Sequence, residues 1–137
     1  MAHSARLGAA LLRMAVVYLV AGLALGMYMA ISQDHTLATV HSHVGLLGWT
    51  AMAIAGLVYV AVPACAANRL ARWHFWLHTI GLPIMLGGLW ALLATGNARV
   101  EPVVAAGSTL VTVSLVLFAA NVLRHAGTAA SSGPHQA

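Results

Sequence analysis

Two histidines, His41 and His43, stand one residue apart at the start of a hydrophobic segment. An α-helix turns by about 100° per residue, so positions i and i+2 lie roughly 200° apart around its axis. The two imidazoles therefore face nearly opposite sides of one helix and cannot easily bind the same ion. This spacing favours a helix that lies between two metal centres, because imidazole is a common metal ligand. The alternative is that both rings touch water and headgroups at a helix end.

Small residues continue the helix face that begins at His41. They are Gly45, Gly48 and Gly56, with Met52 between them. A strip of small residues admits either a close-packed partner helix or a planar macrocycle, and the sequence alone does not separate the two. Met52 could add a thioether ligand, although methionine is more often a flexible filler of the core.

A second pair, His74 and His78, has the i, i+4 spacing that places both rings on one helix face. That spacing can form a two-histidine metal site. No carboxylate or cysteine in the same half of the predicted membrane segments completes a zinc site. We therefore expect His74 to lie at the headgroups and His78 to bond to a neighbouring helix.

Composition identifies an integral membrane protein of one domain. Of the 137 residues, 61% are hydrophobic and 6% are charged, against about 25% charged residues in soluble domains. The basic pI reflects six arginines without any lysine, and no basic cluster interleaved with aromatics indicates nucleic-acid binding. Cys65 is the only cysteine, which excludes an intrachain disulfide.

Four apolar segments are each long enough to cross a hydrocarbon core of about 30 Å. They span residues 12–31, 40–62, 73–94 and 103–123. The short loops between them predict antiparallel neighbours. We expect an all-α bundle of four transmembrane helices within residues 1–126, followed by a disordered tail rich in Ser, Gly and Ala over residues 127–137.

The arginines predict the orientation in the bilayer. Five of the six lie on one side of the four predicted spans: Arg6, Arg13, Arg69, Arg72 and Arg124. The positive-inside rule then places both termini in the cytoplasm and His41 and His43 near the outer surface. The expected location is the inner membrane of a bacterium.

Residues 39–63 resemble the tenth helix of subunit I of the haem-copper oxidases, which carries a His-x-His pair and typically ends in an aromatic residue followed by proline. Here the pair is His41-Ser42-His43, and the end is Tyr59-Val60-Ala61-Val62-Pro63. The following run, Trp73-His74-Phe75-Trp76, is similar to the start of the next helix of that family. The resemblance covers about residues 36–90.

The resemblance implies that His41 and His43 are axial ligands of two different haems, one on each side of the helix. It implies haem b, and the lack of a Cys-x-x-Cys-His motif favours non-covalent attachment. Gly45, Gly48 and Met52 would lie beside the ring. Copper is doubtful, because the adjacent His-His pair and the His/Tyr element of the family are missing.

Two further groups of residues could support such a site. Arg99 is the only arginine on the outer side and is the candidate partner of the haem propionates, unless it pairs with Glu101 or Asp34 in water. Ser42 or Thr39 could hydrogen-bond the ring nitrogen that does not bind metal.

Subunit I of the family has twelve helices in three arcs of four with approximate threefold symmetry, so this chain resembles one arc and three copies would rebuild the ring. A helix with ligands on two opposite faces makes a heterologous contact that can close into such a homotrimer. Each interface would then hold one bis-histidine haem for electron transfer, whose donor and acceptor the sequence does not identify. The alternatives are a small oxidase-like or nitric-oxide-reducing enzyme with an open haem, and a copper-handling or assembly protein.

Overall fold

The computed structural model describes residues 2–125, and the side chains from Arg6 onward. The predicted tail over residues 127–137 lies outside the described residues. The long helices are α1 (Ala2–Ser32), α5 (Arg69–Thr95) and α6 (Glu101–His125), together with a composite helix made of α2 (Ala38–His43), η1 (Val44–Ala51) and α3 (Met52–Ala61). We call this composite Ala38–Ala61 helix 2. Two short helices, α4 (Pro63–Ala66) and η2 (Ala98–Val100), lie in the connections.

Four helices within the described residues are long and apolar enough to cross a membrane, and no strand occurs among these residues. The predicted all-α class with four spans is therefore confirmed, whereas the orientation of the termini stays a prediction. The observed helices are longer than expected at several ends. α1 begins at Ala2 instead of residue 12, and α5 begins at Arg69 instead of residue 73.

Helix 2 contains an eight-residue π-helical segment, η1, directly after His43. A π-turn bonds residue i to residue i+5 and holds more residues than an α-turn, so the chain rotates less with each residue. The regular 100° step assumed from the sequence therefore fails across Val44–Ala51. Side chains below this segment lie on a different face from the one that an unbroken α-helix predicts.

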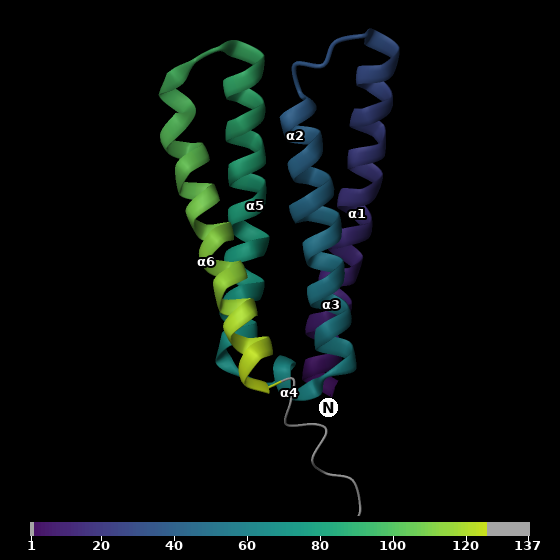
Figure 1. The fold of residues 1–137 in the computed structure, drawn as a ribbon, viewed down its shortest axis with the longest axis vertical. Helices are drawn as coiled ribbons and strands as arrows, with labels where there is room; N and C mark the ends of the chain where they lie inside the picture. The colour runs from purple at the N-terminus through teal and green to yellow at the C-terminus, as the bar shows by residue number, and fades with distance from the viewer. Residues whose placement is uncertain (1, 126–137) are drawn as a thin grey trace, which may run out of the picture.

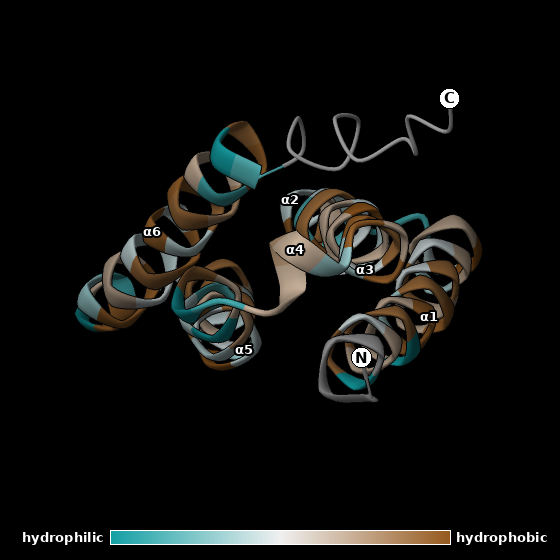
Figure 2. Ribbon diagram, turned by 90° about the horizontal axis from the view of Figure 1, so that it is seen from below, coloured by the Kyte–Doolittle hydropathy of each residue, from teal (hydrophilic) through white to brown (hydrophobic). Residues whose placement is uncertain are grey.

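The four long helices form an open, bent row in the order α6, α5, helix 2 and α1 (Figures 1 and 2). α1 packs along η1 and α3, and α5 packs mainly on α6, so the chain is two hairpins. The hairpins meet where helix 2 contacts α5 and where α4 contacts α6. Both long hairpin loops lie at the same end of the molecule, opposite the N-terminus (Figure 1).

Glycines allow the close helix contacts inside each hairpin. A Cβ atom at Gly107 of α6 would collide with the backbone nitrogen of Met85 on α5. A Cβ atom at Gly8 of α1 would lie 2.7 Å from the carbonyl oxygen of Gly56 on α3. Small residues at such crossings bring the backbones of membrane helices together, and here they determine which helices pair.

Polar side chains define the ends of the helices. The side chain of Asn68 accepts a hydrogen bond from the backbone of Ala71 and caps the start of α5. At the other end, Gly96 follows Thr95 in a left-handed conformation (φ 67°) and terminates the helix. In the loop before α2, Asp34 Oδ1 accepts hydrogen bonds from the backbone and the hydroxyl of Thr36. This turn directs the chain into helix 2 and so places His41 and His43 near the loop end of the bundle.

Candidate functional site

His41 is half-buried where helix 2 faces α1, and its Nδ1 lies 3.0 Å from the carbonyl oxygen of Gly22. A carbonyl oxygen only accepts hydrogen bonds, so Nδ1 carries the proton. In the neutral ring the lone pair is then on Nε2. Gly26 makes this position of the ring possible, because a Cβ atom there would lie 2.9 Å from Cε1 of His41.

His43 has the same pattern of bonding on the other side of helix 2. Its Nδ1 donates to the carbonyl oxygen of Thr39 at 2.8 Å, and its Nε2 makes no hydrogen bond within residues 2–125. The expected support from Thr39 is present, although through its backbone and not its side chain. The hydroxyl of Ser42 donates to Ala38 instead and contacts neither ring nitrogen.

His41 and His43 therefore both hold the proton on Nδ1 and leave the lone pair on Nε2. Imidazoles that bind metal nearly always donate their other ring N–H to a carbonyl or carboxylate, which fixes the tautomer and the ring orientation. The two rings flank the exposed surface of helix 2, where Ser42 and Leu46 lie. The arrangement is thus that of two separate single-histidine donors, not of one chelate.

The predicted strip of small residues is open only at Gly45, the end nearest His41. A Cβ atom at Gly45 would meet nothing within 4 Å, whereas one at Gly48 would lie 2.6 Å from the Tyr18 ring. Met52 is 1% exposed and belongs to the core. From Gly48 toward α3, helix α1 packs against this strip. Gly48 and Met52 therefore have no open space beside them and are not part of the candidate site.

A shallow groove of about 100 Å³ runs beside His41 and Gly45. It is lined by α1 and helix 2 through Tyr18, Leu19, Gly22, Leu23, His41, Gly45 and Trp49. Pockets that enclose cofactors usually measure about 300–1,000 Å³. The groove is therefore too small to enclose a cofactor by itself.

Arg99 lies in η2, in the connection between α5 and α6. This connection lies at the same end of the bundle as the start of α2 (Figure 1). The backbone N–H of Arg99 donates to the side chain of Asn97. The exposed guanidinium forms no ion pair with Asp34 or Glu101 in the described part of the chain. Its expected role toward an acidic ligand group stays a prediction.

The second histidine pair is buried between the hairpins. His78 is confirmed as a bridge to its neighbours: Nε2 donates to the carbonyl oxygen of Leu47 at 3.0 Å, and Nδ1 bonds to the Ser114 hydroxyl at 3.1 Å. The expected headgroup position of His74 is wrong, because the side chain is only 1% exposed. The early start of α5 carries His74 more than one turn into the helix.

His74 faces the end of helix 2. Its Nδ1 shares a hydrogen bond of 3.0 Å with the Tyr59 hydroxyl, and its ring lies against that of Phe118 on α6. Its Nε2 is buried and has no hydrogen-bond partner among the described residues. This nitrogen is enclosed by protein, so a planar cofactor cannot reach it.

Sequence reasoning missed the polar contacts that α6 makes. Ser114 and Asn121 are fully buried, and Asn121 donates to the carbonyl oxygen of Cys65 and accepts from Asn68. The available signal was their spacing of seven residues, which puts two lone polar side chains on the same face of an apolar helix. These contacts join α6 to the connection between the hairpins.

No group of three or more His, Cys, Asp or Glu side chains within residues 2–125 is arranged to hold a metal ion jointly. A copper or zinc centre built from such a cluster is therefore not found in this part of the chain. The chemistry offered by His41 and His43 is that of single imidazole donors.

Curated proteins show partial similarity to the chain. It is 36% identical over 63 residues to cytochrome c oxidase subunit 1 of Rhodobacter capsulatus, covering 42% of this chain and 12% of the relative. It is 35% identical over 63 residues to a cytochrome c oxidase subunit 1 homolog of Agrobacterium tumefaciens (strain T37), covering 42% of this chain and 11% of that relative. The Cbb3-type cytochrome c oxidase subunit CcoN1 of Stutzerimonas stutzeri is 38% identical over 56 residues, covering 36% of this chain and 12% of that relative.

The aligned part is thus about one-eighth of the length of these relatives. No family model and no solved structure matches the chain. Together, the partial matches and the four spans support an integral membrane protein related to subunit I of the haem-copper oxidases.

Proposed function

We propose that the chain is a membrane b-type cytochrome of the bacterial inner membrane that transfers electrons, with His41 and His43 as axial haem ligands at subunit interfaces of a homotrimer. The observation that carries the proposal is the bonding of the two rings. Each Nδ1 donates to a backbone carbonyl, and each Nε2 is left with its lone pair. A neutral imidazole with this tautomer is the form that binds haem iron.

The residues beside the donors fit a haem only as part of a shared site. Gly45 leaves open space next to His41, but the groove there is too shallow to enclose a macrocycle. His41 and His43 face opposite sides of helix 2, so each would contribute to a site shared with a different neighbouring subunit. A heterologous contact of this kind closes into a ring when the rotation between subunits permits it. Three copies of a four-helix row match the twelve helices that the resemblance implies.

Each protein group has a defined task in this arrangement. The carbonyls of Gly22 and Thr39 hold the two rings in one tautomer and one orientation. Arg99, at the same end of the bundle, would neutralise propionates that point toward the aqueous side. When bound, a haem with two imidazole ligands supplies reversible one-electron storage at its iron. The leading alternative, an oxidase-like or nitric-oxide-reducing enzyme, differs in leaving one axial position open.

The absorption spectrum of the purified protein tests the proposal. Protein expressed with ample haem should show a Soret band and, after reduction, the sharp bands of low-spin haem b, with one haem for each chain. Carbon monoxide should leave the reduced spectrum unchanged. A stoichiometric carbon monoxide adduct would replace the cytochrome proposal with the enzyme alternative. A colourless preparation whose stability rises with added copper would favour the copper-handling alternative.

A further inference from the structure

A large cleft separates the two hairpins at their loop end, on the other side of α1 from the His41 groove. Its volume is about 800 Å³, within the range of sites that hold small molecules. α1 contributes Ala21, Ala24, Leu25 and Tyr28, and α5 contributes Trp90 and Ala94. We call it the outer cleft. None of its residues belongs to the proposed haem site.

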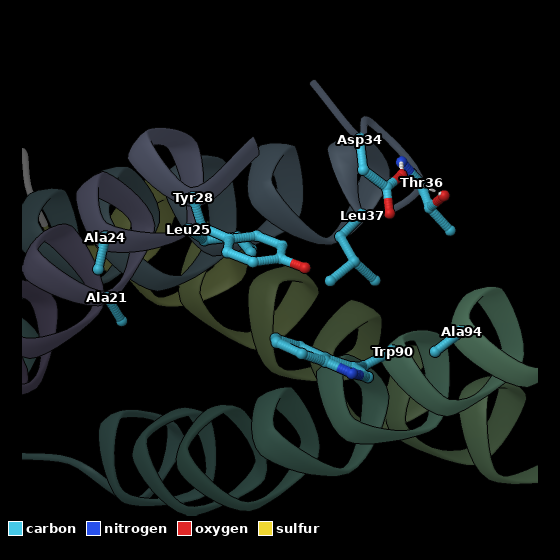
Figure 3. A pocket seen from close by; sticks show the side chains of 9 residues that line it. All are labelled: Ala21, Ala24, Leu25, Tyr28, Asp34, Thr36, Leu37, Trp90 and Ala94. Atoms are coloured by element: carbon cyan, nitrogen blue, oxygen red, sulfur yellow. Dashed lines mark hydrogen bonds between the residues drawn. The ribbon is translucent and has the colours of Figure 1, made fainter. Parts of the chain in front are cut away.

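The outer cleft changes from apolar to polar along its length. Ala21, Ala24 and Leu25 lie toward the end away from the loop, and Asp34 and Thr36 lie at the loop end, which we call the mouth (Figure 3). Alanines leave width for an extended hydrocarbon chain, while the carboxylate marks the aqueous end. An amphiphile with its tail in the bilayer and its head at the loop fits this order.

Two aromatic rings project into the cleft from opposite walls, Tyr28 from α1 and Trp90 from α5 (Figure 3). They are 55% and 48% exposed, so about half of each residue stays open to a ligand. The faces of aromatic rings attract cations. Both rings lie near helix ends, and aromatic residues at helix ends of membrane proteins commonly lie at the depth of the lipid headgroups.

The carboxylate at the mouth has one oxygen still available. Both hydrogen bonds from Thr36 go to Oδ1 of Asp34, and Oδ2 has no partner within residues 2–125. These two bonds also hold the pKa of Asp34 below its ordinary value, so the group is charged at neutral pH. An ionised acceptor that lines the same cleft as two aromatic rings favours a cationic hydrogen-bond donor and repels an anionic head.

We infer that the outer cleft binds a phospholipid with a primary ammonium headgroup, as in phosphatidylethanolamine. The ammonium lies between Oδ2 of Asp34 and the rings of Tyr28 and Trp90, and one acyl chain follows Ala24 and Leu25. The bound lipid fills the gap between the hairpins at the end where the protein leaves them apart. This inference is independent of haem binding.

Native mass spectrometry with defined lipids tests the inference. The purified protein is incubated with equimolar phosphatidylethanolamine and phosphatidylglycerol of matched acyl chains. We expect one retained phosphatidylethanolamine for each chain and a preference of about fivefold over phosphatidylglycerol, the upper end for one exposed charge pair. Asp34→Asn should abolish the preference while lipid is still retained.

The matched pair Ala24→Phe and Ala119→Phe separates cleft binding from general lipid adhesion. Ala24 lines the cleft and Ala119 is exposed on α6, so the same side chain is added at both sites. The first variant should lose the retained lipid and the second should keep it, with unchanged helix content by circular dichroism. Equal retention by both variants, or equal retention of the two lipids by the wild type, would overturn the inference.

Discussion

The two histidine pairs occur in the same fold but differ in what surrounds their ring nitrogens. His41 and His43 lie half-buried at the loop end, and each keeps an Nε2 with no partner among residues 2–125. His78 on α5 forms hydrogen bonds through both ring nitrogens and so links α5 to helix 2 and α6. The one ring nitrogen of His74 without a partner among residues 2–125 is buried in the protein interior. Access to the nitrogen lone pair, more than the spacing of the histidines, therefore separates a candidate ligand from a packing residue.

The strongest test of this comparison removes one histidine from each pair. His41→Ala and His43→Ala should each abolish the six-coordinate low-spin spectrum of all bound haem, because every shared site uses both residues. His74→Ala should retain that spectrum, since its free nitrogen is enclosed. The measurement is the reduced-minus-oxidised spectrum with a haem assay, and His35→Ala in the exposed loop is the control. A full low-spin complement in either outer variant would disprove the shared-interface arrangement.

The inner pair should instead determine stability. His78→Ala removes the bonds to Leu47 and Ser114 and leaves a cavity, so we expect a loss of about 2–4 kcal/mol in the free energy of unfolding. Titration with a denaturing detergent, followed by circular dichroism, measures the loss. His43→Ala should change it by less than about 1 kcal/mol in haem-free protein. Equal losses in the two variants would remove the distinction between the pairs.

Two glycines extend the comparison to the backbone. Gly107→Ala places a methyl group against the backbone of Met85 and should cost about 1–3 kcal/mol by forcing α5 and α6 apart. Gly45→Ala meets open space and should leave unfolding unchanged or slightly raise stability. Thermal unfolding in detergent distinguishes the two. If Gly107→Ala unfolds at the wild-type temperature, the close packing of that hairpin is not needed for stability.

The smallest expected effect concerns pH at the turn that precedes helix 2. The hydroxyl and then the backbone N–H of Thr36 lower the pKa of Asp34 by hydrogen bonding. A lowered pKa in the folded protein means that this contribution to stability is complete above the ordinary value of about 4 and is lost as pH falls through the folded value. The Thr36 amide resonance should therefore shift below about pH 4, while Asp34→Asn shows no such transition. An amide signal that is constant from about pH 6 to pH 3 would contradict the role of this turn.

Composition, hydropathy and loop length were sufficient to predict the four spans, because a bilayer requires long apolar helices. The fixed angular step of an α-helix applies to His41 and His43, since both precede the π-helical segment. Beyond His43 the chain rotates more slowly through η1, and Met52 lies in the core, where a filler methionine is expected. The bonding of His74 to Tyr59 was not predictable, because it depends on how two distant helix ends meet.

The π-helical segment has a mechanical consequence for helix 2. Because its wider turns rotate the chain less per residue, they change the direction in which the His41 and His43 end of helix 2 faces relative to the Tyr59 end. The two ends can therefore face different neighbours without a break in the helix. Losing or gaining a residue within Val44–Ala51 would rotate the imidazoles relative to the rest of the bundle while leaving every loop unchanged.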